Sequence, residues 1–66
     1  MPNSLSELAH MLAERDGISY EEEVAAIREV MFELNEAFLK GDYNLAETIL
    51  LEDLGIEPDY LDLFIL

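Results

Sequence analysis

The clearest pattern lies in the middle of the chain, where apolar residues recur at alternating spacings of four and three. These positions are Tyr20, Val24, Ile27, Met31, Leu34 and Phe38. Such spacing is that of a heptad seam on one helix, and Val30 and Ala37 beside the seam widen it into a core face. Ser19 followed by Glu22 predicts a capping box at its start, and Lys40 suits its C-terminal end. We therefore predict a helix about 30 Å long that begins at residue 20 and ends near residue 40.

A shorter amphipathic segment precedes this helix. Ser4 followed by Glu7 predicts a second capping box, and Arg15 suits the C-terminal end of a helix dipole. We predict a helix over residues 5–16. Its inner stripe consists of Leu5, Leu8, Ala9 and Leu12.

Two further helices are predicted in the second half of the chain. Asp42 is a suitable N-cap for a helix over residues 43–54. The inner face of this helix is expected to contain Leu45, Ala46, Ile49, Leu50 and Leu54. Pro58, a residue suited to the first helical position, begins a short and mostly apolar C-terminal helix.

Three glycines divide these segments, and each follows a stretch of helical periodicity, where a left-handed cap is expected. No alternation typical of a strand occurs. The pattern predicts an all-α fold over residues 1–66 as one domain, a small bundle of three main helices plus a short C-terminal one. The helix over residues 20–40 is its spine, and its two neighbours pack antiparallel to it.

Residues 41–58 resemble the second half of a tetratricopeptide motif. The positions that carry the resemblance are Gly41, Tyr43, Ala46, Leu50 and Pro58. It implies a helix hairpin, with the glycine at the turn and the proline at the end, and it implies protein binding. Asp53 departs from the motif, as do Glu33 and Leu34 in the preceding helix. Since a solenoid needs several repeats, we expect one tetratricopeptide-like hairpin.

Composition adds two constraints. The 66 residues include 16 acids and three bases, a formal net charge of −13, and 52% of the residues are hydrophobic. The charge opposes direct binding to nucleic acid and to anionic membranes. The apolar content is more than a chain this short easily buries. We therefore expect a homo-oligomer, and a two-fold dimer is the commonest kind.

The chain contains no cysteine, so it forms neither a disulfide nor a thiolate metal site. It has no apolar run long enough to span a membrane. The first residues lack the pattern of a signal peptide. We expect a cytoplasmic protein.

The sequence offers little for catalysis or for metal binding. His10 is the only histidine, and no residue is singled out as its partner. We expect no enzymatic activity and no cofactor. Glu7 and His10 have the Glu-x-x-His spacing of di-iron helix bundles. Because His10 falls outside the predicted apolar stripe, a carboxylate/histidine metal site is only a third hypothesis.

Two surfaces are candidates for a function. An apolar interaction surface is predicted to use Val30, Met31, Phe38, Leu61, Phe64 and Leu66. An acidic surface is predicted in the second half of the chain, where seven acids occur without a base; its residues are Glu47, Glu52, Asp53, Glu57, Asp59 and Asp62. We predict a non-catalytic, homodimeric protein–protein interaction module or small regulator. The alternative is an acidic inhibitor that mimics nucleic acid and binds a basic protein.

Overall fold

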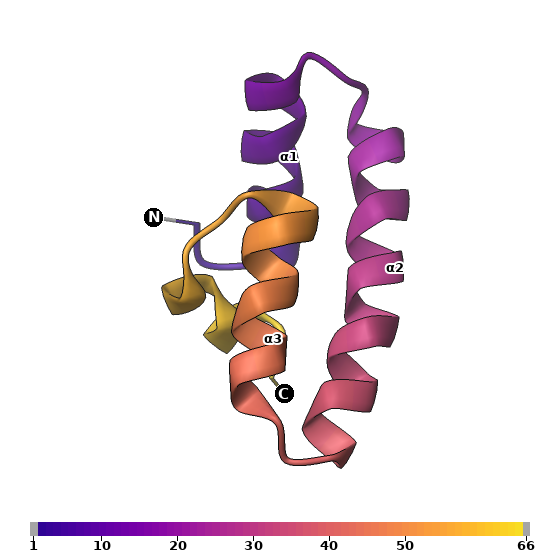
Figure 1. Ribbon diagram of the computed structural model, residues 1–66. Coiled ribbons are helices and arrows are strands. Elements are labelled where there is room, and N and C mark those ends of the chain that lie inside the picture. Colours follow the sequence, from indigo (N-terminus) through magenta and orange to yellow (C-terminus); the bar gives the residue numbers. More distant parts are fainter. Residues whose placement is uncertain (1, 66) are drawn as a thin grey trace.

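The computed structural model describes residues 2–65, and every regular element in them is a helix (Figure 1). The elements are α1 (Leu5–Asp16), α2 (Tyr20–Leu39), α3 (Tyr43–Ile49), the π-helical turn η1 (Leu50–Leu54) and the 3-10 helix η2 (Pro58–Leu63). The predicted all-α fold of three main helices and a short C-terminal one is confirmed. Each predicted helix begins at the expected residue.

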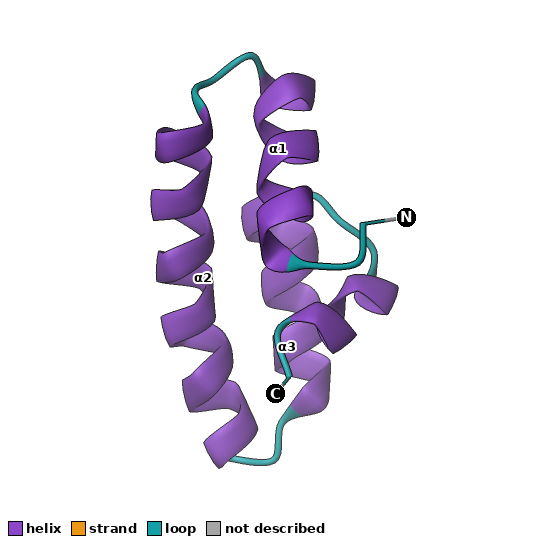
Figure 2. Cartoon of the chain, turned by 180° about the vertical axis from the view of Figure 1, so that it is seen from behind, coloured by secondary structure: helices purple, strands orange, loops and turns teal. Residues whose placement is uncertain are grey.

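Helix α2 runs the length of the molecule, whose principal extents are 33 × 21 × 20 Å. Figures 1 and 2 show α1 antiparallel to the first half of α2 and α3 antiparallel to its second half, both on the same side of α2. The chain after η1 turns back towards α1 and α3. The bundle therefore consists of two helix hairpins that share α2.

The predicted capping hydrogen bonds at the N-termini of α1 and α2 form, with one difference. Ser19 accepts a hydrogen bond from the Glu22 N–H, and Glu22 accepts one from the Ser19 N–H, so this capping box is complete. Ser4 caps α1 through the Glu7 N–H. The Glu7 carboxylate, however, accepts from the N–H of Asn3 at 2.6 Å and not from that of Ser4, so the first predicted box is only half formed.

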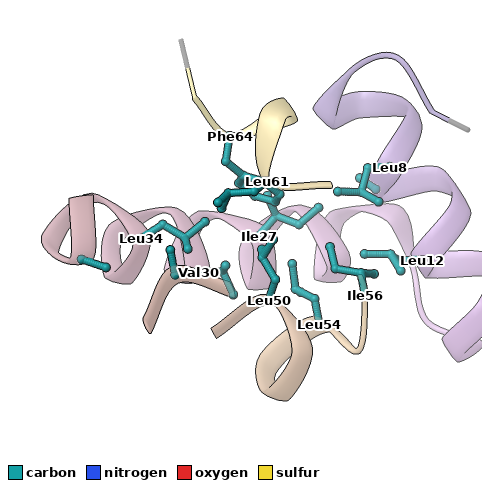
Figure 3. Close-up of a cluster of buried hydrophobic side chains, with 13 residues drawn as sticks. Leu8, Leu12, Ile27, Val30, Leu34, Leu50, Leu54, Ile56, Leu61 and Phe64 are labelled. Atoms are coloured by element: carbon teal, nitrogen blue, oxygen red, sulfur yellow. The ribbon is translucent and has the colours of Figure 1, made fainter. Parts of the chain in front are cut away.

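The core lies between α2 and the elements on its inner side (Figure 3). The α2 residues in it are Glu23, Ile27, Val30, Leu34 and Ala37. This stripe is rotated from the predicted seam, because Tyr20, Val24, Met31 and Phe38 are only half-buried. These four residues of the predicted seam thus lie at the edge of the core. Val30 and Ala37, which were predicted to lie beside the seam, are buried in its centre.

The helix predicted over residues 43–54 changes its winding in the last turn. Residues 50–54 form a wider π-helical turn, and the Ile56 N–H donates to the Leu50 carbonyl at 3.3 Å. Gly55 ends the helix at a φ of 63°, a conformation that favours glycine. This reversal returns Ile56 to the core, where it is buried. Leu45, predicted on the inner face, lies outside the core and is exposed, so that prediction is wrong.

The C-terminal segment belongs to the core. Leu61 and Phe64 are each only 8% exposed and join the main apolar cluster. Ile65, next in the chain, is 48% exposed. Leu61 and Phe64, which were predicted for an interaction surface, therefore form part of the core of the single chain.

Replacing Phe64 with alanine is therefore expected to lower the free energy of unfolding by about 3 kcal/mol, because it empties a buried aromatic site. The neighbouring change Ile65→Ala is expected to cost less than about 0.5 kcal/mol, since that side chain is exposed. Urea unfolding followed by circular dichroism measures both. Equal losses for the two variants would contradict the assignment of η2 to the core.

Candidate interaction surfaces

The six residues predicted for an apolar interaction surface lie in different environments. Val30, Leu61 and Phe64 are buried in the core of the single chain, so they are not free to meet a partner. Met31 and Phe38 are half-buried on α2. Leu66 lies outside the described residues. Of the five that the structure describes, only Met31 and Phe38 offer surface next to solvent.

Those two residues belong to a longer apolar band on the outer side of α2. Its most exposed members are Phe32, at 69%, and Leu39, at 81%. We call this band the α2 strip and define it as Val24, Arg28, Met31, Phe32, Asn35, Phe38 and Leu39. They form three series with a seven-residue spacing, which are Val24/Met31/Phe38, Arg28/Asn35 and Phe32/Leu39. Together they cover about one third of the helix circumference. The strip is a continuous line along α2 and not a set of scattered side chains.

Shallow grooves accompany the strip along its inner edge. One groove, of about 220 Å³, lies between α1 and α2 and is lined by Leu5, Ala9, Val24 and Met31 among others. A second begins at Met31 and reaches Phe38 and Phe64. Met31 lines both grooves, so the strip is bordered by a hollow on each side of this residue along α2.

The charge of the strip is opposite to that of the chain. It contains Arg28 and no acid, whereas the protein has a net charge of −13. The guanidinium of Arg28 is exposed, and within residues 2–65 it forms no hydrogen bond or ion pair. The acids of the same helix, Glu29, Glu33 and Glu36, lie on its other side. The strip therefore offers apolar surface with one uncompensated positive charge.

The acids on that other side of α2 form a groove with η1. Glu29 and Glu33 line it together with Glu52 and Asp53, and its volume is about 480 Å³. A hydrogen bond shared with the Asp53 carboxyl raises the pKa of Glu33, and the negative charges of its neighbours act in the same direction. No lysine or arginine lines this groove.

The structure brings only part of the predicted acidic surface together. All six of its residues are exposed. Glu52 and Asp53 enter the groove, where they meet Glu29 and Glu33 from α2. Glu47, Glu57, Asp59 and Asp62 do not line it. The two α2 glutamates were not predicted to belong to this surface, although their spacing places them on one side of the helix.

The weak metal candidates are occupied by other contacts. Glu7 accepts the hydrogen bond from Asn3. The His10 ring stacks on Tyr20, with ring centroids 4.1 Å apart, and the Tyr20 hydroxyl lies 3.1 Å from the Ser6 hydroxyl. In the part of the chain that the structure describes, no three His, Asp or Glu side chains are arranged to hold a metal ion.

A polar junction that the sequence did not predict lies where α1, α2 and η1 meet. Arg15 donates to the carbonyls of Leu54 at 2.7 Å and Gly55 at 3.1 Å, and it is paired with Asp16 at 2.8 Å. Glu23 lies close by in the core stripe and is only 2% exposed. Its burial raises its pKa, the charge of Asp16 adds to that effect, and the charge of Arg15 opposes it. This junction ties the end of α1 to the end of η1.

Comparisons with family models, with curated proteins and with solved structures find no match to this chain. The tetratricopeptide resemblance therefore stays a prediction. No helix in residues 2–65 is long and apolar enough to cross a membrane.

Glu23 provides a pH-dependent test of the junction. Because its pKa is raised on folding, its ionised form destabilises the fold, and the penalty disappears as pH falls towards the ordinary value of 4.5. Glu23→Gln is expected to raise the free energy of unfolding at neutral pH, and its advantage over the wild type is expected to shrink near about pH 5. Urea unfolding at the two pH values measures this.

The adjacent Glu22 is a control of opposite sign. Hydrogen bonds from Ser19 lower its pKa, so its ionised form stabilises the fold and the benefit is lost as pH falls below 4.5. Glu22→Gln should therefore destabilise the protein at neutral pH. If both variants shifted stability in the same direction, the assigned environments would be wrong.

Proposed function

We propose that this protein is a non-catalytic protein–protein interaction module, a small regulator that acts as a homodimer through the α2 strip. The observation that carries the proposal is the strip itself. It places exposed Phe32 and Leu39 beside half-buried Met31 and Phe38 in one acid-free line. Contiguous apolar surface of this kind is uncommon on a monomer and marks interaction sites.

The size of the protein supports self-association. A chain of 66 residues buries only about 60% of the surface of its unfolded form, so oligomerisation is a usual source of added stability. The chain has no disulfide to supply that stability. Covering the strip with a second copy adds apolar burial without adding any new segment.

Two matched variants test this proposal. The wild type is expected to have twice the 7.5 kDa mass of one chain in light scattering at micromolar concentration. Phe32→Lys should weaken the dimer at least about tenfold, because it removes an aromatic anchor from the strip. Leu51→Lys makes the same charge change at a side chain that is 62% exposed on η1, and the dimer should remain.

Circular dichroism checks that both variants keep the helical fold. A wild-type mass of 7.5 kDa at high micromolar concentration and ordinary salt would exclude the homodimer. Equal effects of the two lysine variants would exclude the strip as the interface.

The acidic groove supports a second candidate function, in which the protein mimics nucleic acid and occupies the binding site of a basic protein. The observation in its favour is the crowding of four carboxylates, Glu29, Glu33, Glu52 and Asp53, in one groove without a base. A hydrogen bond with Asp53, together with the negative charges of Asp53 and Glu29, raises the pKa of Glu33, so its ionised form is disfavoured. A basic partner would relieve the repulsion.

Affinity capture with immobilised protein tests the second candidate. The wild type should retain basic, nucleic-acid-binding proteins from a cell extract, and the double variant Glu33→Gln/Asp53→Asn should retain them poorly. A matched double variant, Glu57→Gln/Asp59→Asn, removes the same charge outside the groove and should behave as the wild type. Capture of proteins without basic character would exclude mimicry.

A further inference from the structure

We infer that the second half of the bundle contains a binding pocket for a quaternary ammonium group, built from the aromatic rings of Phe38, Tyr43 and Phe64. The inference goes beyond the proposed function and does not rest on it. Three observations lead to it: the residues that line the pocket, the geometry of two of its rings, and the charge around it.

The lining of the pocket is mainly aromatic. The chain has three phenylalanines and three tyrosines, and half of these six residues line one pocket of about 260 Å³. The other lining residues among those that the structure describes are Asn35 and Ile65. The three rings come from α2, from α3 and from the residues after η2. The fold, and not one local motif, therefore assembles this pocket.

Two of the rings form an angled pair next to solvent. The ring centroids of Phe38 and Tyr43 lie 5.9 Å apart, and the ring planes are inclined by 42°. A cation is attracted to the face of an aromatic ring when it lies within about 6 Å of the ring centroid. Tyr43 is 58% exposed, so a ligand can reach the pair. Phe64, in contrast, is held in the core and gives the pocket a fixed wall.

The charge around the pocket favours a cation. No base is among its lining residues in the described part of the chain, whose net charge is −13. Lys40 lies two positions after Phe38, about 200° round the helix, and so on the other side of α2. Arg28 lies ten positions before Phe38, about 15 Å away along the helix axis. Asp42, directly before Tyr43, is exposed and adds negative charge nearby.

These properties select a quaternary ammonium group among the possible cations. No carboxylate is among the described lining residues, so a primary ammonium or a guanidinium group would lose water there without gaining an ion pair. A trimethylammonium group has no N–H to satisfy, and its charged methyl groups contact ring faces directly. The pocket is also smaller than the roughly 300–1,000 Å³ typical of sites for drug-sized ligands, which suits a small cation.

Titration with choline, followed by heteronuclear NMR, tests the pocket. Choline is expected to bind and to shift the backbone signals of Phe38, Tyr43 and Phe64. The neutral alcohol in which a tert-butyl group replaces the trimethylammonium group has the same shape. It should bind at least about fivefold more weakly, because it lacks the charge that ring faces attract. Equal binding of the two compounds would overturn the inference, as would the absence of any shift with choline.

Two matched tyrosine variants locate the site. Tyr43→Leu should weaken choline binding at least about threefold, because the pocket loses one ring. Tyr20→Leu makes the same change at the first residue of α2, outside the pocket, and should bind choline as the wild type does. Circular dichroism checks that both variants keep the helical fold. If the two variants weakened choline binding equally, the pocket would not be the site.

A peptide that contains trimethyllysine tells whether the group belongs to a free cation or to a modified protein. It should bind at least about fivefold more tightly than the same peptide with unmodified lysine. Tighter binding of the modified peptide than of choline assigns the group to a protein, and the reverse assigns it to a small molecule. Equal binding of the modified and unmodified peptides would contradict recognition of a quaternary ammonium group.

Asn35 and Phe38 also belong to the α2 strip, so the pocket borders the proposed dimer contact. The choline titration is therefore repeated with protein diluted until light scattering gives the 7.5 kDa mass of one chain, where choline should still bind. Failure to bind at both concentrations overturns the inference. It leaves the homodimer unaffected, because the mass alone tests the dimer.

Discussion

The structure depends on the burial of one stripe of α2. Ile27, Val30 and Leu34 face inwards along this helix; α1, α3 and η1 pack against it, and η2 packs against α3 and η1. Helix α2 is the shared partner of both hairpins, because α1 and α3 lie against different halves of it. A chain this small gains only a marginal core, so a cavity in the shared stripe weakens both hairpins at once.

The same helix also determines how the strongly acidic chain distributes its charge. One side of α2 is the core, a second is the apolar strip with Arg28, and a third carries the glutamates that face η1. Arg15, another of the three bases, is used within the fold, where it binds the carbonyl groups at the end of η1. Arg15 thus serves the fold, Arg28 remains exposed on the strip, and most of the negative charge is left on the exposed sides of the bundle.

The helices were predictable because their signals are local. Ser19, Asp42 and Pro58 mark helix starts through hydrogen bonds or backbone geometry that involve only neighbouring residues. The exact core face of α2 was not predictable from the sequence, because its apolar residues span a wide arc and two overlapping heptad seams fit the pattern. The second seam, which includes Val30 and Ala37, has the same spacing and continues back to Glu23. Because residue 23 carries a carboxylate, it did not count as an apolar position of a seam.

Contacts between distant segments left little trace in the sequence. Nothing near Arg15 in the chain indicates that it binds the carbonyls of Leu54 and Gly55, about forty positions away. The acidic groove likewise requires the packing of η1 beside Glu29 and Glu33. The apolar residues Leu61 and Phe64 were noticed, but whether they face the core or a partner depends on how the chain turns after Gly55.

The charge of −13 limits how this protein can associate, and the distribution around α2 meets that limit. At physiological salt, exposed charges more than about 8 Å apart are largely screened from each other. Glu29 and Glu33 lie on a different side of α2 from the strip, so a strip-to-strip contact does not place them directly against the same residues of the other copy. A strongly acidic chain can therefore form a dimer if the acid-free side of its longest helix is the contact.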